Sequence, residues 1–333
     1  MEDSLPQDQP VVQTFNRVRD AFPAETSGAA VVVKAKDVTA APVRAAIDKL
    51  ERLAATDPRL FPGRSVDVEV NDAHTVASVG VEIAGDGENQ LSNDALDEIR
   101  GTLVPQSLAR VPGAQVWVDG QTAQERDFND TLTSNLPIVF GFVMLAAFVL
   151  LLVTFRSLVI PIKAIALNLL SVGAAYGAMV LVFQHGWFKG LLGFEHTGPI
   201  VAWLPVFLFV VLFGLSMDYH VFILSRVREA YDKGMRTQDA VGYAIKNTAG
   251  VVTSAAIVMV AVFAVFGSLS FIVFKQMGVG LAVAVLLDAT LIRGVLLPAT
   301  MQLLGDRNWW LPRSLGWLPR AGAHRGEVAP ARG

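Results

Sequence analysis

The sequence predicts an α+β membrane protein, in which a small domain of strands and helices precedes a bundle of five transmembrane helices. Hydrophobic residues make up 53% of the 333 residues and charged residues only 17%, against the roughly 25% of an average soluble domain. Five apolar runs are long enough to span a bilayer, and all of them follow residue 135. Residues 1–135 hold 12 Lys/Arg and 22 Asp/Glu, a net charge of −10, whereas residues 136–333 hold 15 and 8, a net charge of +7. We therefore expect an acidic soluble domain over 1–135, followed by a membrane domain.

The first domain alternates between strand and helix patterns. Strands are predicted over residues 29–35, 66–70, 76–83 and 114–118, where β-branched residues gather or apolar residues alternate with polar ones. Thr39 precedes a stretch with apolar residues at helical spacing, so we expect it to cap a helix, and we expect Ser92 to open a second one. The resulting order, βαββαβ, is that of the ferredoxin-like fold.

This first domain carries no recognisable catalytic motif. His74 is its only histidine, and it lacks both a nucleophile spaced with a base and a glycine-rich phosphate loop. Its acidic balance argues against nucleic acid as a partner, and the absence of cysteine from the whole chain excludes thiolate chemistry. We therefore expect no enzyme, no bound cofactor or metal, and no nucleic-acid partner.

The second domain, residues 136–305, contains the five apolar runs. They predict transmembrane helices over residues 136–155, 159–183, 201–224, 248–269 and 277–298. The loop after the third helix and the tail, residues 306–333, are rich in Lys and Arg, whereas the opposite loops offer only Lys189 and Lys275. The positive-inside rule then predicts a multi-pass protein of the cell membrane, with residues 1–135 extracytoplasmic and the tail cytoplasmic.

Asp218 and Tyr219 lie in the middle of an otherwise apolar run, PVFLFVVLFGLSMDYHVFILSRVR. A charged carboxylate in the bilayer centre costs roughly 2.5–3.5 kcal/mol or more, so it usually marks a site that handles protons or ions. No basic residue lies in the central part of the five spans to pair with it. We therefore predict that Asp218 binds and releases protons and that the hydroxyl of Tyr219 is coupled to it.

A few other polar residues inside the spans have two interpretations each. Asp288, which precedes Arg293 by five residues, either supports the relay or forms a structural ion pair with a neighbouring helix. Thr253 and Ser254 either extend the relay or bond to their own helix backbone. His220 either carries protons or is a neutral packing residue. The candidates for relay support are thus Asp288, Thr253, Ser254, Asn168 and His220.

The glycines Gly173 and Gly177 stand at the GxxxG spacing in the second span. Small residues at this spacing let the backbones of two membrane helices approach closely. We therefore expect both glycines at a helix contact.

Several sequence blocks resemble the MMPL family of the resistance-nodulation-division superfamily. They are GLSMDY at 214–219, SRVRE at 225–229, TAGVVTSAA at 248–256, KQMGVGLAVAVLLDATLIRGVLLPA at 275–299 and GDRNWWLP at 305–312. The resemblance implies a porter-type extracytoplasmic domain, a proton relay at Asp218 and Tyr219, and proton-driven export of lipids or other hydrophobic compounds. His220 stands where better-known members often have an acidic residue.

Members of this family are usually built from two similar halves, and this chain resembles the second half without its first span. The expected partners are the N-terminal half of the same transporter or a split partner, a lipid or hydrophobic substrate, and protons, with a homo-oligomer also open. No signal sequence or spanning run precedes the first domain, which agrees with a half-transporter. Two alternatives stay open: a non-transporting lipid-sensing or scaffold module, and an inactive fragment of such a transporter.

Overall fold

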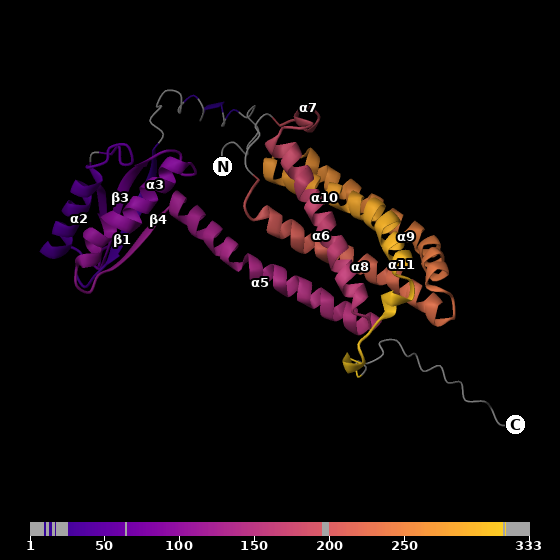
Figure 1. The fold of residues 1–333 in the computed structure, drawn as a ribbon. Helices are drawn as coiled ribbons and strands as arrows, with labels where there is room; N and C mark the ends of the chain where they lie inside the picture. The colour runs from indigo at the N-terminus through magenta and orange to yellow at the C-terminus, as the bar shows by residue number, and fades with distance from the viewer. Residues whose placement is uncertain are drawn as a thin grey trace. The chain divides into compact units, whose positions relative to one another are not determined.

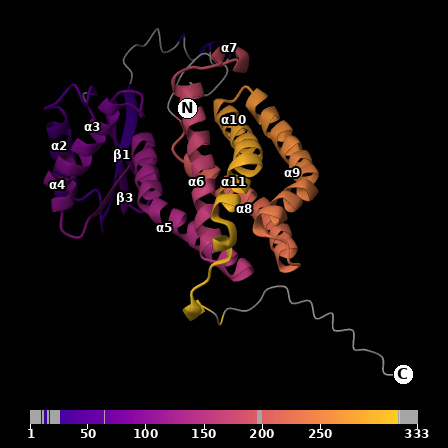
Figure 2. The same cartoon turned by 45° about the vertical axis from the view of Figure 1, so that its right-hand side comes forward.

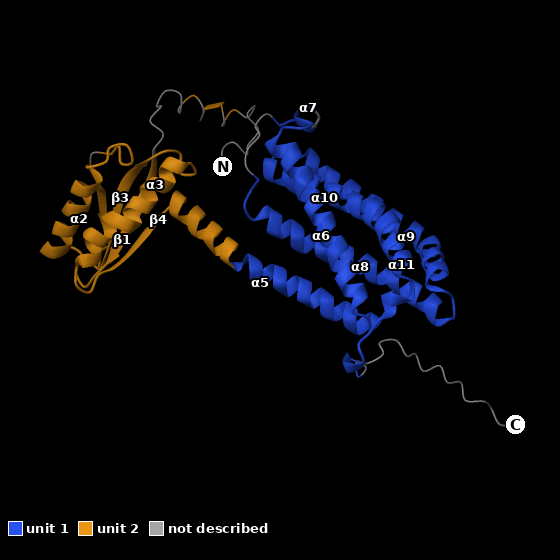
Figure 3. Cartoon of the chain, viewed as in Figure 1, with its two compact units in different colours: residues 1–7, 135–333 blue, residues 8–134 orange. Residues whose placement is uncertain are grey.

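The computed structural model describes residues 10, 13–14, 17, 26–63, 65–194, 200–315 and 317. They form two compact units that divide between Ser134 and Asn135 (Figure 3). We call them the sheet unit and the helical unit. Most of the predicted tail, from residue 318 onward, lies outside the described residues.

The sheet unit contains one four-stranded antiparallel sheet with helices beside it (Figure 1). Its strands follow the order β2-β3-β1-β4, and each neighbouring pair is antiparallel. In chain order the elements are β1 (Thr26–Lys34), α2 (Ala41–Ala54), β2 (Asp67–Val70), β3 (Val76–Ala84), α3 (Gln90–Glu98) and β4 (Gln115–Gly120).

Alternation along the strands builds the core of the sheet unit. Val31 and Val33 of β1 and Val79 of β3 are fully buried, and they belong to one cluster with Leu50 of α2. Because side chains of a strand point alternately to its two faces, the same alternation leaves the opposite face of the sheet partly exposed. In α2 the buried residues include Val43, Ala46, Ile47 and Leu50, which recur at helical spacing. The apolar pattern after residue 39 therefore predicted the buried face of α2 correctly.

The helix caps differ from those that the sequence predicted. Thr39 does not cap α2; its hydroxyl donates to Asp37 at 2.6 Å, and the N-cap position belongs to Ala40. In α3 the cap is Asn89, whose side chain accepts a hydrogen bond from the backbone N–H of Ser92 at 3.0 Å. Ser92 lies inside the helix, where its hydroxyl donates to the carbonyl of Ala84.

The helical unit contains the five predicted long apolar helices, and the α+β membrane class is thereby confirmed. They are α5 (Gln121–Phe155), of which the part from Asn135 onward belongs to the helical unit, α6 (Val159–Met179) with its π-helical extension η4 (Val180–Gln184), α8 (Leu204–Asp232) and α9 (Thr237–Ser268). The fifth is α10 (Ile272–Leu287), which continues through the π-helix η5 (Asp288–Leu296) into α11 (Leu297–Leu304). A short helix, α7 (Lys189–Leu192), precedes α8. Helices α5 and α9 begin earlier than the apolar runs do, because polar turns continue each helix beyond its apolar part.

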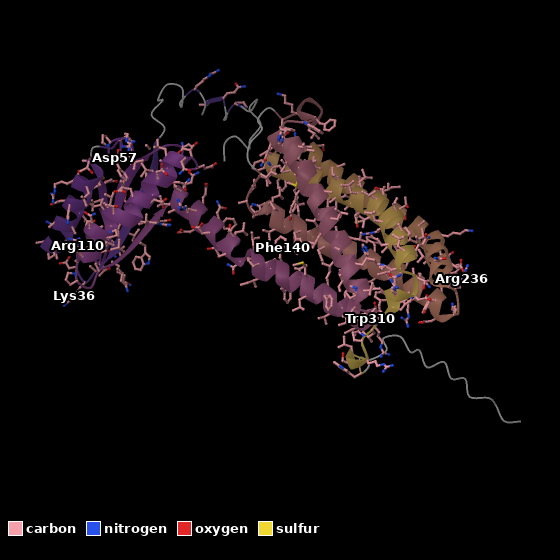
Figure 4. All side chains as sticks on the ribbon, in the orientation of Figure 1. Lys36, Asp57, Arg110, Phe140, Arg236 and Trp310 are labelled. Atoms are coloured by element: carbon pink, nitrogen blue, oxygen red, sulfur yellow. The ribbon has the colours of Figure 1, made fainter. Side chains whose placement is uncertain are left out.

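Helix α5 packs against the bundle through aromatic and apolar side chains. Phe140, labelled in Figure 4, stacks on Phe209 of α8 with ring centroids 3.9 Å apart. Further along the helix, Leu151 and Phe155 are buried in the core of the helical unit.

Helices α9 and α10 form a tight hairpin, which both views show at one side of the bundle (Figures 1 and 2). A Cβ atom on Gly278 would lie 2.2 Å from the backbone nitrogen of Gly267 and 2.6 Å from the carbonyl oxygen of Phe263. Only glycine permits this approach. The prediction for Gly173 and Gly177 was wrong for the described residues, among which a Cβ at either position would meet no atom within 4 Å.

The 3-10 helix η6 (Gly305–Trp309) is hydrogen-bonded to α6 and α11 through the side chain of Asn308. Asn308 is fully buried, and its side-chain oxygen accepts a hydrogen bond from the ammonium of Lys163 at 3.0 Å. Its amide donates to the carbonyls of Met301 and Gly305, while its own carbonyl accepts from the hydroxyl of Ser157. Lys163 is thus a buried structural residue.

Candidate functional site

A cluster of polar side chains lies in the centre of the helical unit, surrounded by apolar residues. Its members come from α6, α8 and η5, and each is at most 6% exposed: Asn168, Ser216, His220, Asp288 and Arg293. We call these five residues the central polar cluster. Burial of polar and charged groups is costly unless they are paired, so their contacts decide what the cluster does.

Asp288 and Arg293 form an ion pair within one helix. In an α-helix, two residues that are five positions apart point in different directions. In the π-helix η5 the backbone hydrogen bonds join residues five positions apart. The two side chains therefore lie on the same side and meet. The sequence analysis offered an ion pair between Asp288 and a neighbouring helix as one alternative. Asp288 does form an ion pair, but its partner Arg293 lies on the same helix.

Arg293 also ties η5 to α8. Its guanidinium lies 4.5 Å from the centre of the Tyr219 ring, and one nitrogen is 3.4 Å from the carbonyl oxygen of Ser216. A guanidinium over an aromatic face is a favourable cation–π contact. Tyr219 is thereby held beside the central polar cluster.

The hydroxyl of Ser216 contacts three other members of the cluster. Its oxygen lies 2.6 Å from Oδ1 of Asn168, 3.0 Å from Oδ1 of Asp288 and 3.4 Å from Nδ1 of His220. The same imidazole nitrogen is 3.1 Å from the carbonyl oxygen of Ser216. Ser216 and His220 are four residues apart on α8, which places them on one face of the helix.

A small cavity of about 20 Å³ adjoins the cluster. Ser216, Asp288, Arg293, Asn168 and Tyr219 contribute to its lining. A polar cavity of this size has room for one water molecule. Among the described residues, Asn168 Nδ2, His220 Nε2 and Arg293 Nε have no hydrogen-bond partner. Asn168 and Arg293 line the cavity, so a water molecule there would lie beside them, whereas His220 does not line it.

Asp218 faces away from this cluster. It is exposed near the middle of α8, and it has no hydrogen bond or ion pair with any residue that the structure describes. Exposed positions recur at helical spacing along the same side of α8, at Phe207, Val210, Gly214, Asp218 and Ser225. Tyr219 is half-buried, lines the cavity and has its hydroxyl 4.0 Å from the sulfur of Met259. The two neighbours in sequence thus lie in different surroundings.

The remaining predicted residues divide in the same way. Asn168, His220 and Asp288 belong to the central polar cluster, whereas Thr253 and Ser254 are exposed on α9. The hydroxyl of Ser254 donates to the carbonyl of Val251 on its own helix at 3.0 Å. The sequence analysis missed Ser216 as a site residue, although its spacing from His220 was a usable signal.

Comparison with known proteins adds to this geometry. The sequence matches the MMPL family over residues 3–327. It is 37% identical over 306 residues to the mycolic acid-containing lipids exporter MmpL11 of Mycolicibacterium smegmatis. This match covers 91% of this chain and 30% of the MmpL11 chain. It is 36% identical over 231 residues to the trehalose monomycolate exporter MmpL3 of the same organism, a match that covers 68% of this chain and 22% of MmpL3. A third relative, the heme uptake protein MmpL11 of Mycobacterium tuberculosis, is 44% identical over 218 residues, a match that covers 65% of this chain and 22% of that relative.

The chain spans less than a third of the length of these relatives. The family match, in contrast, extends over nearly all of the chain and includes both the sheet unit and the five long helices. This chain therefore belongs to the MMPL family of membrane transport proteins.

Proposed function

We propose that the chain works as the C-terminal half of a proton-motive-force-driven exporter of lipids or other hydrophobic compounds, and not as an enzyme. The relative matched over 91% of the chain is named an exporter of mycolic acid-containing lipids, which supports this class of cargo. Another relative is named for heme uptake. Lipid and heme are both hydrophobic, so the cargo class fits either name, and the direction of transport is what an assay must establish.

The position of Asp218 is the observation that carries the proposal. Among the described residues the carboxylate has no partner, and it lies on the exposed side of α8 near the middle of the helix. Facing lipid there it would cost roughly 2.5–3.5 kcal/mol or more. A second set of helices, supplied by the N-terminal half or a split partner, would cover this side and provide a polar environment for the carboxylate.

Asp218 and Tyr219 are the proposed proton relay. Protonation removes the charge of Asp218, so the side of α8 that carries it changes its preferred partners and α8 shifts against its neighbours. Tyr219 connects this change to the central polar cluster through the cavity and the guanidinium of Arg293. Asn168, His220 and Asp288 support the relay from inside the bundle, and Thr253 and Ser254 from the exposed face of α9.

The proposed orientation places residues 1–135 outside the cytoplasm and the tail inside it. It is supported by exposed basic residues around the connection between α8 and α9: Arg226, Lys233, Arg236 and Lys246. The sheet unit is then an extracytoplasmic porter-type domain. Its element order and its strand order, β2-β3-β1-β4, agree with a ferredoxin-like fold.

The test is the substitution Asp218→Asn in the complete transporter, assayed by substrate efflux under an imposed pH gradient. The amide keeps the shape of the side chain but cannot take up a proton, so efflux should fall to the background without a gradient. Asp232→Asn is the matched control, because Asp232 is an exposed carboxylate at the end of the same helix, paired with Arg228. It should leave efflux within about twofold, since exposed ion pairs contribute little. Wild-type efflux from the Asp218→Asn variant would end the relay proposal.

A further inference from the structure

We propose that the sheet unit binds the ammonium group of a small amine in a polar crevice between α3 and the first turns of α5. The part of α5 up to Ser134 belongs to the sheet unit, so the whole crevice lies within one compact unit (Figure 3). The site is separate from the central polar cluster, and its binding of an amine does not depend on proton coupling.

The crevice is large enough for a small ligand and is lined almost entirely by polar side chains. Its volume is about 110 Å³, whereas one water molecule takes up about 30 Å³ in the liquid. Glu88 and Asn93 line it on the side of α3. The other side is one face of α5, where the lining residues recur at helical spacing: Thr122, Glu125, Arg126, Asn129 and Asp130.

Negative charge is in excess around the crevice. Three carboxylates contribute to the lining, those of Glu88, Glu125 and Asp130, against the single guanidinium of Arg126. That guanidinium already has a carboxylate partner, because its Nη1 lies 3.2 Å from Oδ2 of Asp97 on α3. The excess of carboxylates therefore favours a ligand of positive charge.

The amide of Gln121 shows where two of these carboxylates come together. Its Nε2 lies 3.4 Å from Oε1 of Glu88 and 3.3 Å from Oε1 of Glu125. Two negative groups thus share one neutral donor, and they repel each other across it. Gln121 is exposed, so its side chain has room to turn aside. An ammonium beside the two carboxylates replaces their repulsion by attraction.

The hydroxyl of Thr122 points to a ligand independently of these charges. Thr122 lines the crevice and is only 4% exposed. Its Oγ1 has no hydrogen-bond partner among the residues that the structure describes. A buried polar atom without a partner costs free energy and is rare in native proteins. An N–H group of a bound ligand would supply the missing partner.

The acceptors around the crevice suit an ammonium group better than a metal ion. A divalent ion needs several oxygen ligands within about 2.0–2.6 Å, and no three acidic or histidine side chains in the described part of the chain are placed to hold one. A primary ammonium has three N–H donors, which bond to separate acceptors. Glu88, Glu125 and Thr122 offer three acceptors in the same crevice, and bonds from an ammonium to a carboxylate are among the stronger hydrogen bonds.

The test uses the full purified chain in detergent with methylammonium as the probe. Saturation-transfer NMR should detect transfer from the protein to the methyl protons, with a signal that reaches a plateau as methylammonium is added. Tetramethylammonium has the same charge but no N–H donor, so at equal ionic strength it should give no such plateau and should not compete. Equal binding of the two cations would overturn the proposal, and so would displacement of methylammonium by a lower concentration of Mg²⁺.

A charge-neutral substitution then assigns the binding to the crevice. Glu125→Gln keeps the shape of the side chain and removes its charge, so the affinity for methylammonium should fall about tenfold or more, the factor that corresponds to one hydrogen bond to a charged group. Asp48→Asn is the matched control, because Asp48 is an exposed carboxylate on α2 of the same unit and does not line the crevice. It should leave the affinity unchanged.

Two further variants separate binding from folding. Thr122→Val removes the hydroxyl that has no partner, so it should weaken methylammonium binding while the midpoint of thermal unfolding stays the same or rises. Gln121→Lys brings an ammonium of the chain itself to Glu88 and Glu125, so it should raise the midpoint and abolish methylammonium binding. Wild-type affinity in either Gln121→Lys or Glu125→Gln would overturn the proposal. These measurements do not involve transport, so their outcome is independent of the proposed export.

Discussion

The two acidic residues in the middle of the helical unit show how surroundings decide the role of a single side chain. Asp288 is 6% exposed and paired with Arg293, whereas Asp218 is exposed and has no partner among the described residues. Removal of one member of a buried pair is destabilising because it leaves the other charge uncompensated. Asp288 and Arg293 therefore have to be changed together if the fold is to be preserved.

This argument predicts the effect of Arg293→Gln. The substitution should destabilise the helical unit by about 3–5 kcal/mol, since it leaves the carboxylate of Asp288 buried without its partner. It should appear as a lower midpoint of thermal unfolding, followed by tryptophan fluorescence of the purified chain. The double variant Asp288→Asn/Arg293→Gln should recover most of the loss because it buries no charge. A single variant as stable as the double one would contradict this prediction, because it would show that the unpaired carboxylate of Asp288 carries no cost in the fold.

At this scale the sequence identified some residues and missed others for a physical reason. An aspartate in an apolar run is costly wherever it points, so Asp218 stood out from the sequence alone. A serine is cheap to bury, and Ser216 became notable only because α6, α8 and η5 bring Asn168 and Asp288 to its hydroxyl. The spacing of Ser216 and His220 places both on one face of α8, but no local pattern shows that Asn168 and Asp288 meet the same hydroxyl.

At the scale of elements, apolar runs predicted where the long helices lie but not how they are built internally. Hydrophobic length found all five helices, because a span needs about 20 apolar residues. The π-helical turn of η5 (Asp288–Leu296) has the same composition as ordinary helix, and only its i to i+5 geometry aligns Asp288 with Arg293. The close contact of α9 and α10 was likewise missed, since it uses single glycines from two helices and no GxxxG motif.

That contact predicts opposite effects for two glycine substitutions. Gly278→Ala should destabilise the helical unit by about 1–3 kcal/mol, the usual cost of overpacking, because the new methyl group would overlap the backbone at Gly267 and Phe263. Gly173→Ala should be neutral or slightly stabilising in the same chain, since the described structure has open space there and alanine is the better helix former. Thermal unfolding and the yield of monodisperse protein in detergent measure both, and an equal loss in the two variants would contradict the assigned contact.

At the scale of the whole molecule, the division of charge between the two parts of the sequence predicts which side of the membrane each occupies. Because the chain has no cysteine, a single introduced cysteine reports on one position. Lys233→Cys, at the basic connection between α8 and α9, should react with a membrane-impermeant thiol reagent only after cells are opened, and Asp72→Cys should react in intact cells. Labelling of both in opened cells is the control. Reaction of both sites from the same side of intact membranes would refute the proposed topology.

The last prediction concerns what the 333-residue chain does alone. It spans 30% of the relative that it matches over 306 residues, and its helix α8 exposes Asp218 on a side that is otherwise apolar or small, with Phe207, Val210 and Gly214. Without a partner this side would face lipid or another copy of the chain, so we expect the isolated chain to self-associate or to be poorly stable. We also expect no proton-driven efflux when it is reconstituted in liposomes. Co-expression with a matching N-terminal half should restore both stability and transport, and Asp218→Asn in the co-expressed pair should remove the transport and keep the stability. Gradient-driven export by the chain alone would show that one copy, or an assembly of identical copies, completes the transporter without another half.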